Sequence, residues 1–596
     1  MSDDETPAEP RDEEAAVKPQ DPAKAASAGA TKLDLRALLD LPTAIGWRDH
    51  VIGGLLAAVY VTWLLATARS LGFPRDEGFY FHAATDYARW FDQLFKHTSA
   101  ALQKGAIDGP WSQNHEHPAL MKSLFGLSWM FLHERLGLFS DASSAFRLPG
   151  MAMGGLSLWV TYLFGARAFS RRAGLVGAVL LALMPSIFFH AHLACFDVPI
   201  MTMWLVSVYV YWRATHEPTL GWIVAAGVTY GLALETKHNA WILPAVFVAH
   251  AAVVEGRAAA RHLRAGKLRI PAVLVSIAVI GPLVFVALWP WLWSDTAARI
   301  QEYVGFHLNH EYYNIEYLGK NYFGPPSPPS YAPVLILATV PGITILLFFV
   351  GALDRGKELV SRLARAIRGA PGAPAGPRTA RDRAETDVLL FLAFAAPLAV
   401  FFLPKTPIFG GTKHWFPAYP FLAIFAGRGF DLVARAMQSR LAGWDPARLR
   451  LASAALPLAI VLAPLVETVH SHPFGLSAYT PLVGGTAGGA DLGLNRQFWG
   501  FTTQSVAPFL ATAPRGTTVF IHDTAWDSWS RMQAEGRVKS DLRASGSPSD
   551  SAIALVHHEL HMLEVDCGIW MSFGTVAPAY VLRHDGVPIV SVYRRP

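Results

Sequence analysis

Apolar residues fill eleven windows of the chain, and short polar loops separate them. The windows are 50–71, 147–167, 173–193, 198–213, 219–235, 239–254, 270–292, 331–351, 387–404, 414–432 and 451–468. About 20 consecutive apolar residues are enough for a helix to cross the hydrocarbon core of a bilayer. The pattern therefore predicts a mainly α-helical, polytopic membrane protein with about eleven transmembrane helices.

One further apolar stretch, 118–138, contains Lys122, His133, Glu134 and Arg135. Charged side chains are costly inside a bilayer, so we expect this stretch to lie along the membrane surface. With that assignment, the basic loops around Arg171, Arg264, Arg368 and Arg440 all fall on one side of the membrane. Short loops rich in Lys and Arg are typically cytosolic. The opposite, outer face then contains the loops 72–146 and 293–330.

The two ends of the chain differ from its apolar centre. Residues 1–47 are acidic and rich in Ala and Pro, which predicts a disordered cytosolic tail. Residues 48–468 form the predicted transmembrane domain. Residues 469–596 contain short β-like runs such as "TTVFIHD" and no apolar window, so we expect a small extramembrane α/β domain on the outer face.

Composition agrees with this organisation. The chain is 52% hydrophobic and only 16% charged, whereas soluble domains contain about 25% charged residues. The net charge of +5 comes from Lys and Arg in the loops, so it does not indicate nucleic-acid binding. Cys195 and Cys567 are too few for a disulfide framework, and two free thiols are favoured over one bridge.

Ionisable residues from six distant segments fall on the predicted outer face. They are Asp76, Glu77, Glu116, His117, Asp197, Lys237, His238, His307, His310, Lys405, Lys413 and His414. Each one alone is typical of a solvated side chain at a membrane interface. Their common side favours a functional site that faces outward.

These residue types fit transfer of a group from a lipid phosphate. A carboxylate can deprotonate an attacking hydroxyl or amine, and Lys and His can hold a phosphate and stabilise its charge. A departing phosphate with a second pKa near 6 needs no general acid. One carboxylate and a cationic cradle therefore suffice for single-displacement transfer from a lipid phosphosugar, with inversion at the anomeric carbon.

Several motifs in this order resemble a known family. They are Asp76-Glu77 in the first outer loop, "HPAL" at His117, "DVP" at Asp197, "H…H…YLG" from His307 to Gly319, and "KHWFPAYP" from Lys413. The chain resembles the membrane-embedded GT-C glycosyltransferases, specifically the protein O-mannosyltransferase and lipid A aminoarabinose transferase group. The resemblance covers about residues 48–500. Ala119 departs from the pattern, which has a second proline there.

The resemblance implies an inverting glycosyltransferase with Asp76 as catalytic base and a polyprenyl-phosphate sugar as donor. We expect Lys237, His238, Lys413, His414 and His117 to bind the donor phosphate. Glu77, Glu116, Asp197, His307, His310 and Tyr317 are expected to contact substrate or shape the site. A lipid, glycan or protein would be the acceptor, and no cofactor is expected, with a divalent metal left open. The resemblance to bacterial members implies a bacterial inner membrane, and the loop charges predict a cytosolic N-terminus and a periplasmic C-terminal domain.

Three alternatives remain at this stage. A transporter or flippase of a lipid-linked or anionic substrate would have ionisable residues near the bilayer midplane, and a membrane-anchored binding protein would not need these charges to converge. The segment "HHELHMLEVD" (557–566) lacks the HExxH spacing of zinc proteases. His557, His561 and Glu564 would share one face of a helix, but a polar surface is favoured over a zinc site.

Overall fold

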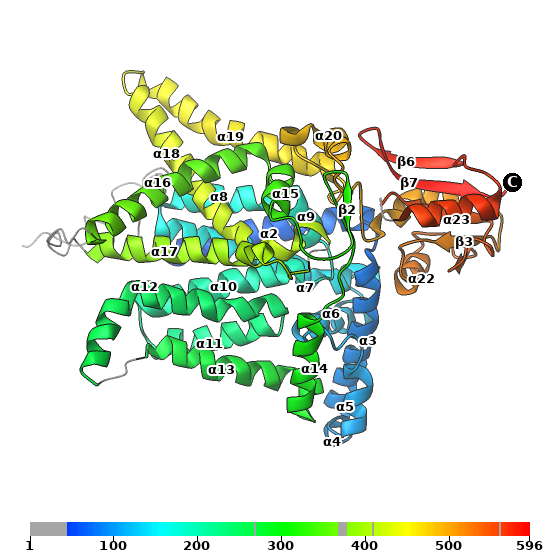
Figure 1. Cartoon of the computed structure of the whole chain (residues 1–596), viewed down its shortest axis with the longest axis horizontal. Coiled ribbons are helices and arrows are strands. Elements are labelled where there is room, and N and C mark those ends of the chain that lie inside the picture. Colours follow the sequence, from blue (N-terminus) through cyan, green and yellow to red (C-terminus); the bar gives the residue numbers. More distant parts are fainter. Residues whose placement is uncertain (1–44, 267–269, 368–377, 408–409, 560–561) are drawn as a thin grey trace, which may run out of the picture.

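The computed structural model describes residues 45–266, 270–367, 378–407, 410–559 and 562–596. The predicted tail, 1–47, lies almost entirely outside these residues. Long helices pack side by side in one part of the molecule, and a small β-sheet lies beyond one end of them (Figure 1). We call this helical part the bundle, and the end nearest the sheet its sheet end.

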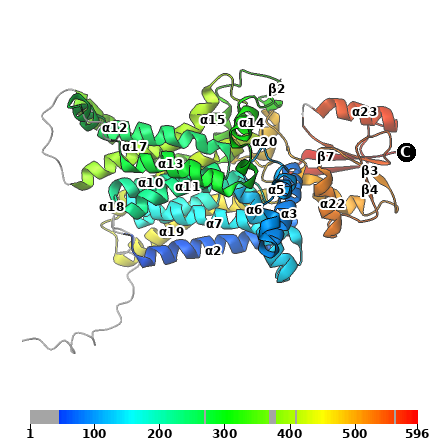
Figure 2. The same ribbon diagram turned by 90° about the horizontal axis from the view of Figure 1, so that it is seen from below.

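Each of the eleven apolar windows coincides with one helix or one bent pair of helices. They are α2 (Trp47–Thr67), α7 (Ala142–Ala168), α8 (Arg171–Ala182) with α9 (Pro185–Ala191), α10 (Asp197–His216), α11 (Leu220–Leu234), α12 (Leu243–Arg264), α13 (Ala272–Leu288), α15 (Tyr331–Thr339) with α16 (Gly342–Ile367), α17 (Arg378–Ala399), α18 (Tyr419–Arg440) and α19 (Pro446–Ser471). Figure 2 shows most of them running along the same direction. The apolar pattern thus located the main helices.

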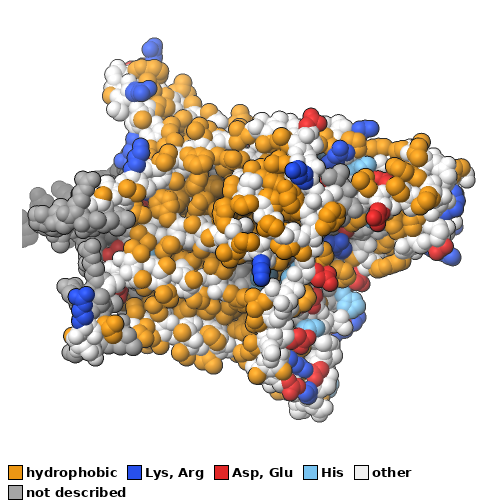
Figure 3. All heavy atoms as spheres, viewed as in Figure 1, with side chains coloured by type: hydrophobic (Ala, Val, Ile, Leu, Met, Phe, Trp, Pro, Cys, Tyr) orange, Lys and Arg blue, Asp and Glu red, His pale blue; other side chains and the backbone are white. Residues whose placement is uncertain are grey.

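Length and apolarity identify a smaller set of candidate spans. Four helical segments of the described residues pass both criteria: Trp47–Ser70, His238–Gly256, Ala384–Phe402 and Pro446–Ser471. The count rises to six if each bent pair, α8 with α9 and α15 with α16, is one span. On the face shown in Figure 3, hydrophobic side chains are spread over the bundle and charged ones lie mainly at its ends, as expected for a membrane protein. The number of eleven crossings stays a prediction.

Glycines allow three helices of the bundle to approach closely. A Cβ atom on Gly351 of α16 would lie 1.9 Å from the backbone oxygen of Phe425 on α18, and one on Gly427 would lie 2.0 Å from that of Ala173 on α8. Small residues permit such close contact where lipid supplies little hydrophobic driving force. Helix α18 is therefore held between α8 and α16.

The first outer loop forms helices that run across the sheet end of the bundle. They are α3 (Arg75–Lys96), α4 (Thr98–Ala101), α5 (Lys104–Trp111), α6 (Leu120–Ser128) and η2 (Trp129–Arg135). In Figure 1, α3 and α5 lie nearly perpendicular to the bundle helices. The stretch 118–138 is thus a short helix, α6, continued by the wider turns of η2.

Short elements complete the connections. They are η1 (Ala68–Ser70), η3 (His238–Ile242), η4 (Pro290–Trp293), α14 (Thr296–Leu308), β1 (Ile315–Tyr317), β2 (Lys320–Tyr322), η5 (Val400–Phe402), η6 (Gly411–Ala418), η7 (Pro481–Val483), α20 (Gly485–Asp491), η8 (Phe501–Val506) and α21 (Ala507–Leu510). Strands β1 and β2 form an antiparallel hairpin in the second outer loop.

The last part of the chain forms a five-stranded sheet in the order β4-β3-β5-β7-β6. The strands are β3 (Thr518–Ile521), β4 (Arg543–Ser545), β5 (Ile553–His557), β6 (Tyr580–His584) and β7 (Val587–Arg594). Strand β3 is parallel to β4 and β5, and β7 is antiparallel to β5 and β6. Helices α22 (Trp526–Ala534) and α23 (Leu563–Phe573) contribute to the cores on the two faces of the sheet.

The sheet does not have a core of its own on the side that faces the bundle. Val519 and Leu555 of the sheet belong to the same buried cluster as Phe73, Phe81 of α3 and Phe125 of α6. The sheet and the first outer loop therefore bury each other's apolar surface, and this contact fixes the sheet against the bundle.

A buried ion pair fixes the start of α3. The guanidinium of Arg147 on α7 donates to both carboxylate oxygens of Glu77, at 2.8 and 2.6 Å, and both side chains are 0% exposed. Arg147 also donates to the backbone oxygens of Ala68, Leu71 and Gly72. One side chain thus holds the end of the first apolar helix and the first turn of α3 in register.

Arg147→Met should lower the free energy of unfolding by about 3–5 kcal/mol, because it leaves the Glu77 carboxylate buried without its cation. Chemical unfolding of the purified protein in detergent measures this change. Arg89→Met is the matched control, since Arg89 pairs with Asp86 at 3.1 Å and is 73% exposed, and its loss should cost less than about 1 kcal/mol. Equal losses in the two variants would contradict the structural role of Arg147.

Candidate functional site

A cavity of about 870 Å³ opens at the sheet end of the bundle, between α3, α14, η6 and the sheet. Ten of the twelve residues assigned to the site from sequence line it: Asp76, Glu116, His117, Asp197, Lys237, His238, His307, His310, Lys413 and His414. Lys405 lines it as well. The structure therefore brings together side chains from all six sequence segments.

Asp76 lies in the first turn of α3 and reaches the cavity between two cations. Its Oδ2 atom is 3.9 Å from Nζ of Lys413, and its Oδ1 atom is 3.9 Å from Nε of Arg75. The Asp76 side chain is 27% exposed, whereas that of Lys413 is 8% exposed. The carboxylate is thus close to positive charge and still accessible to a substrate in the cavity.

Lys413 belongs to η6 and lies over an aromatic ring. Its Nζ atom is 3.8 Å from the ring centroid of Trp499, within the range of a cation–π contact. Burial lowers the pKa of the Lys413 ammonium, although the carboxylates of Asp76 and Asp197 oppose this shift. Gly410 is needed beside it, because a Cβ atom there would lie 2.4 Å from Cε of Lys413 and the backbone φ is +66°.

A second ion pair also lines the cavity. Nζ of Lys237 donates to Oδ1 of Asp197 at 2.7 Å, and the two side chains are 9% and 5% exposed. Asp197 is the first residue of α10 and Lys237 precedes η3. Both pairs, Asp76 with Lys413 and Asp197 with Lys237, therefore face one cavity.

Three histidines form another part of the wall. The ring of His307 lies 4.0 Å from that of His238 and 6.0 Å from that of His117, measured between centroids. Burial lowers the pKa of His117 well below the ordinary value, and it lowers that of His307 to about 4. At neutral pH these two rings are uncharged, so they offer hydrogen bonds without adding positive charge.

Two of the predicted residues do not line this cavity. Glu77 is buried against Arg147 and accepts a hydrogen bond from the backbone N–H of Ala194 at 2.8 Å. Tyr317 is buried in β1, where its hydroxyl donates to Oγ of Ser330 at 2.8 Å. Any influence of these two side chains on the cavity is therefore indirect.

The sheet contributes cavity residues that the sequence did not indicate. Arg75 donates to Oδ1 of Asp523 at 2.8 Å, and Gln497 donates to Oε1 of Glu559 at 3.1 Å. Burial, together with the nearby Asp523, raises the pKa of Glu559 well above its ordinary value. Asp523 follows β3 and Glu559 follows β5, so the carboxyl ends of two parallel strands supply them.

The segment 557–566 does not form the single helix considered from sequence. His557 is the last residue of β5 and is 0% exposed, whereas Glu564 lies on α23. The expectation of a polar surface was therefore wrong for His557, and His561 lies outside the described residues. Cys195 and Cys567 are both free thiols, as favoured above.

Comparison with known proteins supports the family resemblance. Residues 127–289 match the family model of dolichyl-phosphate-mannose-protein mannosyltransferases, and this match confirms the resemblance to the GT-C membrane glycosyltransferases. No curated protein matches the chain.

Among solved structures, ArnT from Cupriavidus metallidurans is similar in its apo state, at 15% identity and a TM-score of 0.46. The same protein bound to undecaprenyl phosphate gives 17% identity and a TM-score of 0.41, and each ArnT match covers 92% of this chain and 98% of that chain. The apo oligosaccharyltransferase of Archaeoglobus fulgidus is 12% identical with a TM-score of 0.45, covering 89% of this chain and 71% of that chain.

The low pKa of His307 gives the folded protein a defined acid sensitivity. In the unfolded chain His307 has a pKa near 6.5, so between about pH 6.5 and pH 4 the unfolded state binds a proton that the folded state does not. Stability therefore falls as the pH falls through this window. His307→Gln should reduce that fall, as measured by chemical unfolding in detergent at stepwise pH. At pH 8 His307 is neutral in both the folded and the unfolded state, so the difference in unfolding free energy between His307→Gln and the wild type there reflects the packing change alone. If the unfolding free energy of the two proteins depends on pH in the same way, the low pKa of His307 in the folded protein is contradicted.

Proposed function

We propose that the protein is an inverting glycosyltransferase that moves a sugar from a polyprenyl-phosphate donor to an acceptor on the periplasmic face of a bacterial inner membrane. The observation that carries this proposal is the pair of Asp76 and Lys413, which face one cavity 3.9 Å apart. A base and a phosphate-binding cation are the two groups that a single displacement at the anomeric carbon requires.

Asp76 acts as the general base. It accepts the proton of the acceptor hydroxyl or amine while that atom attacks the anomeric carbon, and the bond from this carbon to the phosphate oxygen breaks. Glu77 is not available for this role, because both of its oxygens accept hydrogen bonds from the buried Arg147. The structure thus supports Asp76 over its neighbour as the base.

Lys413 and Lys237 bind the donor phosphate. Both ammonium groups are buried in the cavity wall, where a weakly screened positive charge stabilises the phosphate more strongly than it would in water. His117, His238 and His414 add hydrogen-bonding groups from the same wall. The leaving phosphate keeps its electrons as a dianion, with a second pKa near 6, so no general acid is required.

Part of the cavity lining suits a lipid chain. It includes the apolar side chains of Phe306, Leu308, Pro397, Val400, Phe401 and Leu403. Pro397 lies in α17 and Val400 and Phe401 in η5, at the end of a candidate membrane span. These residues support a donor whose polyprenyl chain enters the cavity from the bilayer. The description of the matching family, which names dolichyl-phosphate-mannose, supports a donor of this chemical class.

Asp76→Asn should reduce transfer at least about 100-fold, because an amide cannot accept the proton. The assay measures sugar transfer from polyprenyl-phosphate-linked sugars to acceptors in a membrane extract, with protein in detergent. Asp86→Asn, on the same helix and outside the cavity lining, is the matched control and should keep full activity. Normal transfer by a folded Asp76→Asn variant would remove Asp76 from the mechanism, and lipid movement without any transfer product would favour a flippase.

Lys413→Met should lower kcat/KM for the lipid donor by about 10- to 100-fold, since it removes a charge-assisted contact to phosphate. Kinetics at varied donor concentration measure this effect. Lys320→Met is the control, because Lys320 is exposed on β2 and does not line the cavity. Equal kinetics for the wild type and Lys413→Met would show that the phosphate binds elsewhere.

A further inference from the structure

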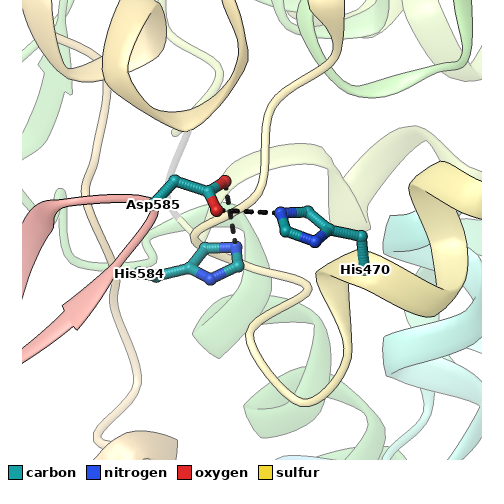
Figure 4. Close-up of side chains that lie close together, drawn as sticks. All are labelled: His470, His584 and Asp585. Atoms are coloured by element: carbon teal, nitrogen blue, oxygen red, sulfur yellow. Dashed lines mark hydrogen bonds and ion pairs between the residues drawn. The ribbon is translucent and has the colours of Figure 1, made fainter.

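Two histidines and an aspartate meet where the sheet contacts α19. His470 lies in the last turn of α19, His584 is the last residue of β6, and Asp585 follows it (Figure 4). One ligand atom from each residue falls within 4.8 Å of the others. None of the three residues lines the 870 Å³ cavity, so the cluster is separate from the proposed active site.

The distances fit the coordination sphere of a transition metal. Nε2 of His470 is 2.8 Å from Oδ1 of Asp585, and Nε2 of His584 is 3.8 Å from Oδ2 of the same carboxylate. In a tetrahedral zinc site with bonds of about 2.0–2.1 Å, neighbouring ligand atoms lie about 3.3 Å apart. The observed separations bracket this value, so small side-chain movements would place all three ligands around one ion.

The burial and the hydrogen bonding of His584 independently indicate a bound ligand. Its side chain is 7% exposed, and its Nε2 atom, which faces Asp585, has no hydrogen-bond partner among the described residues. A buried imidazole nitrogen without a partner is costly, and a bound cation would satisfy it. The other ring contacts of His584, with Phe474 and with His470, hold the imidazole in place.

The backbone around Asp585 places its carboxylate beside the imidazole rings of His470 and His584. Asp585 and Gly586 form the two-residue turn between β6 and β7, with φ angles of +48° and +80°, as in the type I′ turns that favour Asp-Gly. The Thr486 hydroxyl donates to Oδ2 of Asp585 at 2.8 Å, which orients the carboxylate in the way that outer-shell groups orient metal ligands.

A smaller cavity of about 290 Å³ adjoins the cluster and is lined by His470, Asp585 and Glu467. Glu467 lies on α19 three residues before His470, and its Oε2 atom is buried without a hydrogen bond in the described part of the chain. His470 itself is 62% exposed, which gives an ion a route from solvent. The site thus has room for a further ligand or a water molecule.

We propose that His470, His584 and Asp585 bind a zinc ion, which fastens the β6–β7 turn to the end of α19. Two imidazoles with one carboxylate are typical zinc ligands, and they suit calcium or magnesium poorly. The ligands come from segments more than 100 residues apart, so zinc would stabilise the docked position of the sheet. Binding of zinc only to the folded protein raises its stability.

The test uses the full-length protein in detergent, with any purification tag removed and bound metal stripped by a chelator. Isothermal titration with zinc should give one tight site per chain in the wild type. His470→Ala, at an exposed position, and Asp585→Asn, which tolerates the positive φ, should each weaken binding at least about tenfold. His82→Ala is the matched control, since His82 is 52% exposed beside Asp86 and Asp527 but outside the cluster, and it should bind zinc as the wild type does.

Thermal unfolding gives a second measurement that does not depend on transferase activity. Zinc should raise the unfolding temperature of the wild type and of His82→Ala, and it should raise that of His470→Ala and Asp585→Asn by less. The proposal is overturned if the stripped wild type binds no stoichiometric zinc, or if the two cluster variants bind it as tightly as the wild type. In either case the cluster is only a hydrogen bond between His470 and Asp585 with His584 beside it.

Discussion

The buried pair of Glu77 and Arg147 is the constraint on which the cavity depends. Because both side chains are fully buried, their charges must satisfy each other, and the geometry around them has little freedom. Arg147 also holds the backbone oxygens that connect the first bundle helix to α3. Asp76, one residue before Glu77, is consequently directed into the cavity at a fixed position.

The adjacent acids Asp76 and Glu77 lie in different environments. The Glu77 carboxylate is neutralised inside the protein by a permanent partner, whereas Asp76 is partly exposed and lies 3.9 Å from Lys413. A carboxylate with a loose ionic contact can exchange that contact for a substrate, and one with a bidentate guanidinium cannot do so without a large energetic loss. The proposed division between catalysis and support follows from this difference.

The sheet completes the site and also ties it to the bundle. Asp523 and Glu559 close one side of the cavity from the ends of β3 and β5, and aromatic residues of α3 and α6 share a core with the sheet. The proposed zinc ligands lie at a separate contact between the sheet and α19. The shared core and the contact between His470 and Asp585 therefore both hold the sheet relative to Lys237 and Lys413.

The sequence by itself determined the positions of the main helices and most of the polar residues of the site. Apolar windows report burial or lipid contact directly, and loop parity placed Asp76, Lys237 and Lys413 on one side without any contact information. Only the tertiary structure decided which side chains pair. It assigned Glu77 to Arg147, removed Tyr317 from the cavity wall, and brought in Asp523 and Glu559. Such pairings depend on contacts between residues that are far apart in the chain, and no local pattern of hydrophobicity or spacing encodes them.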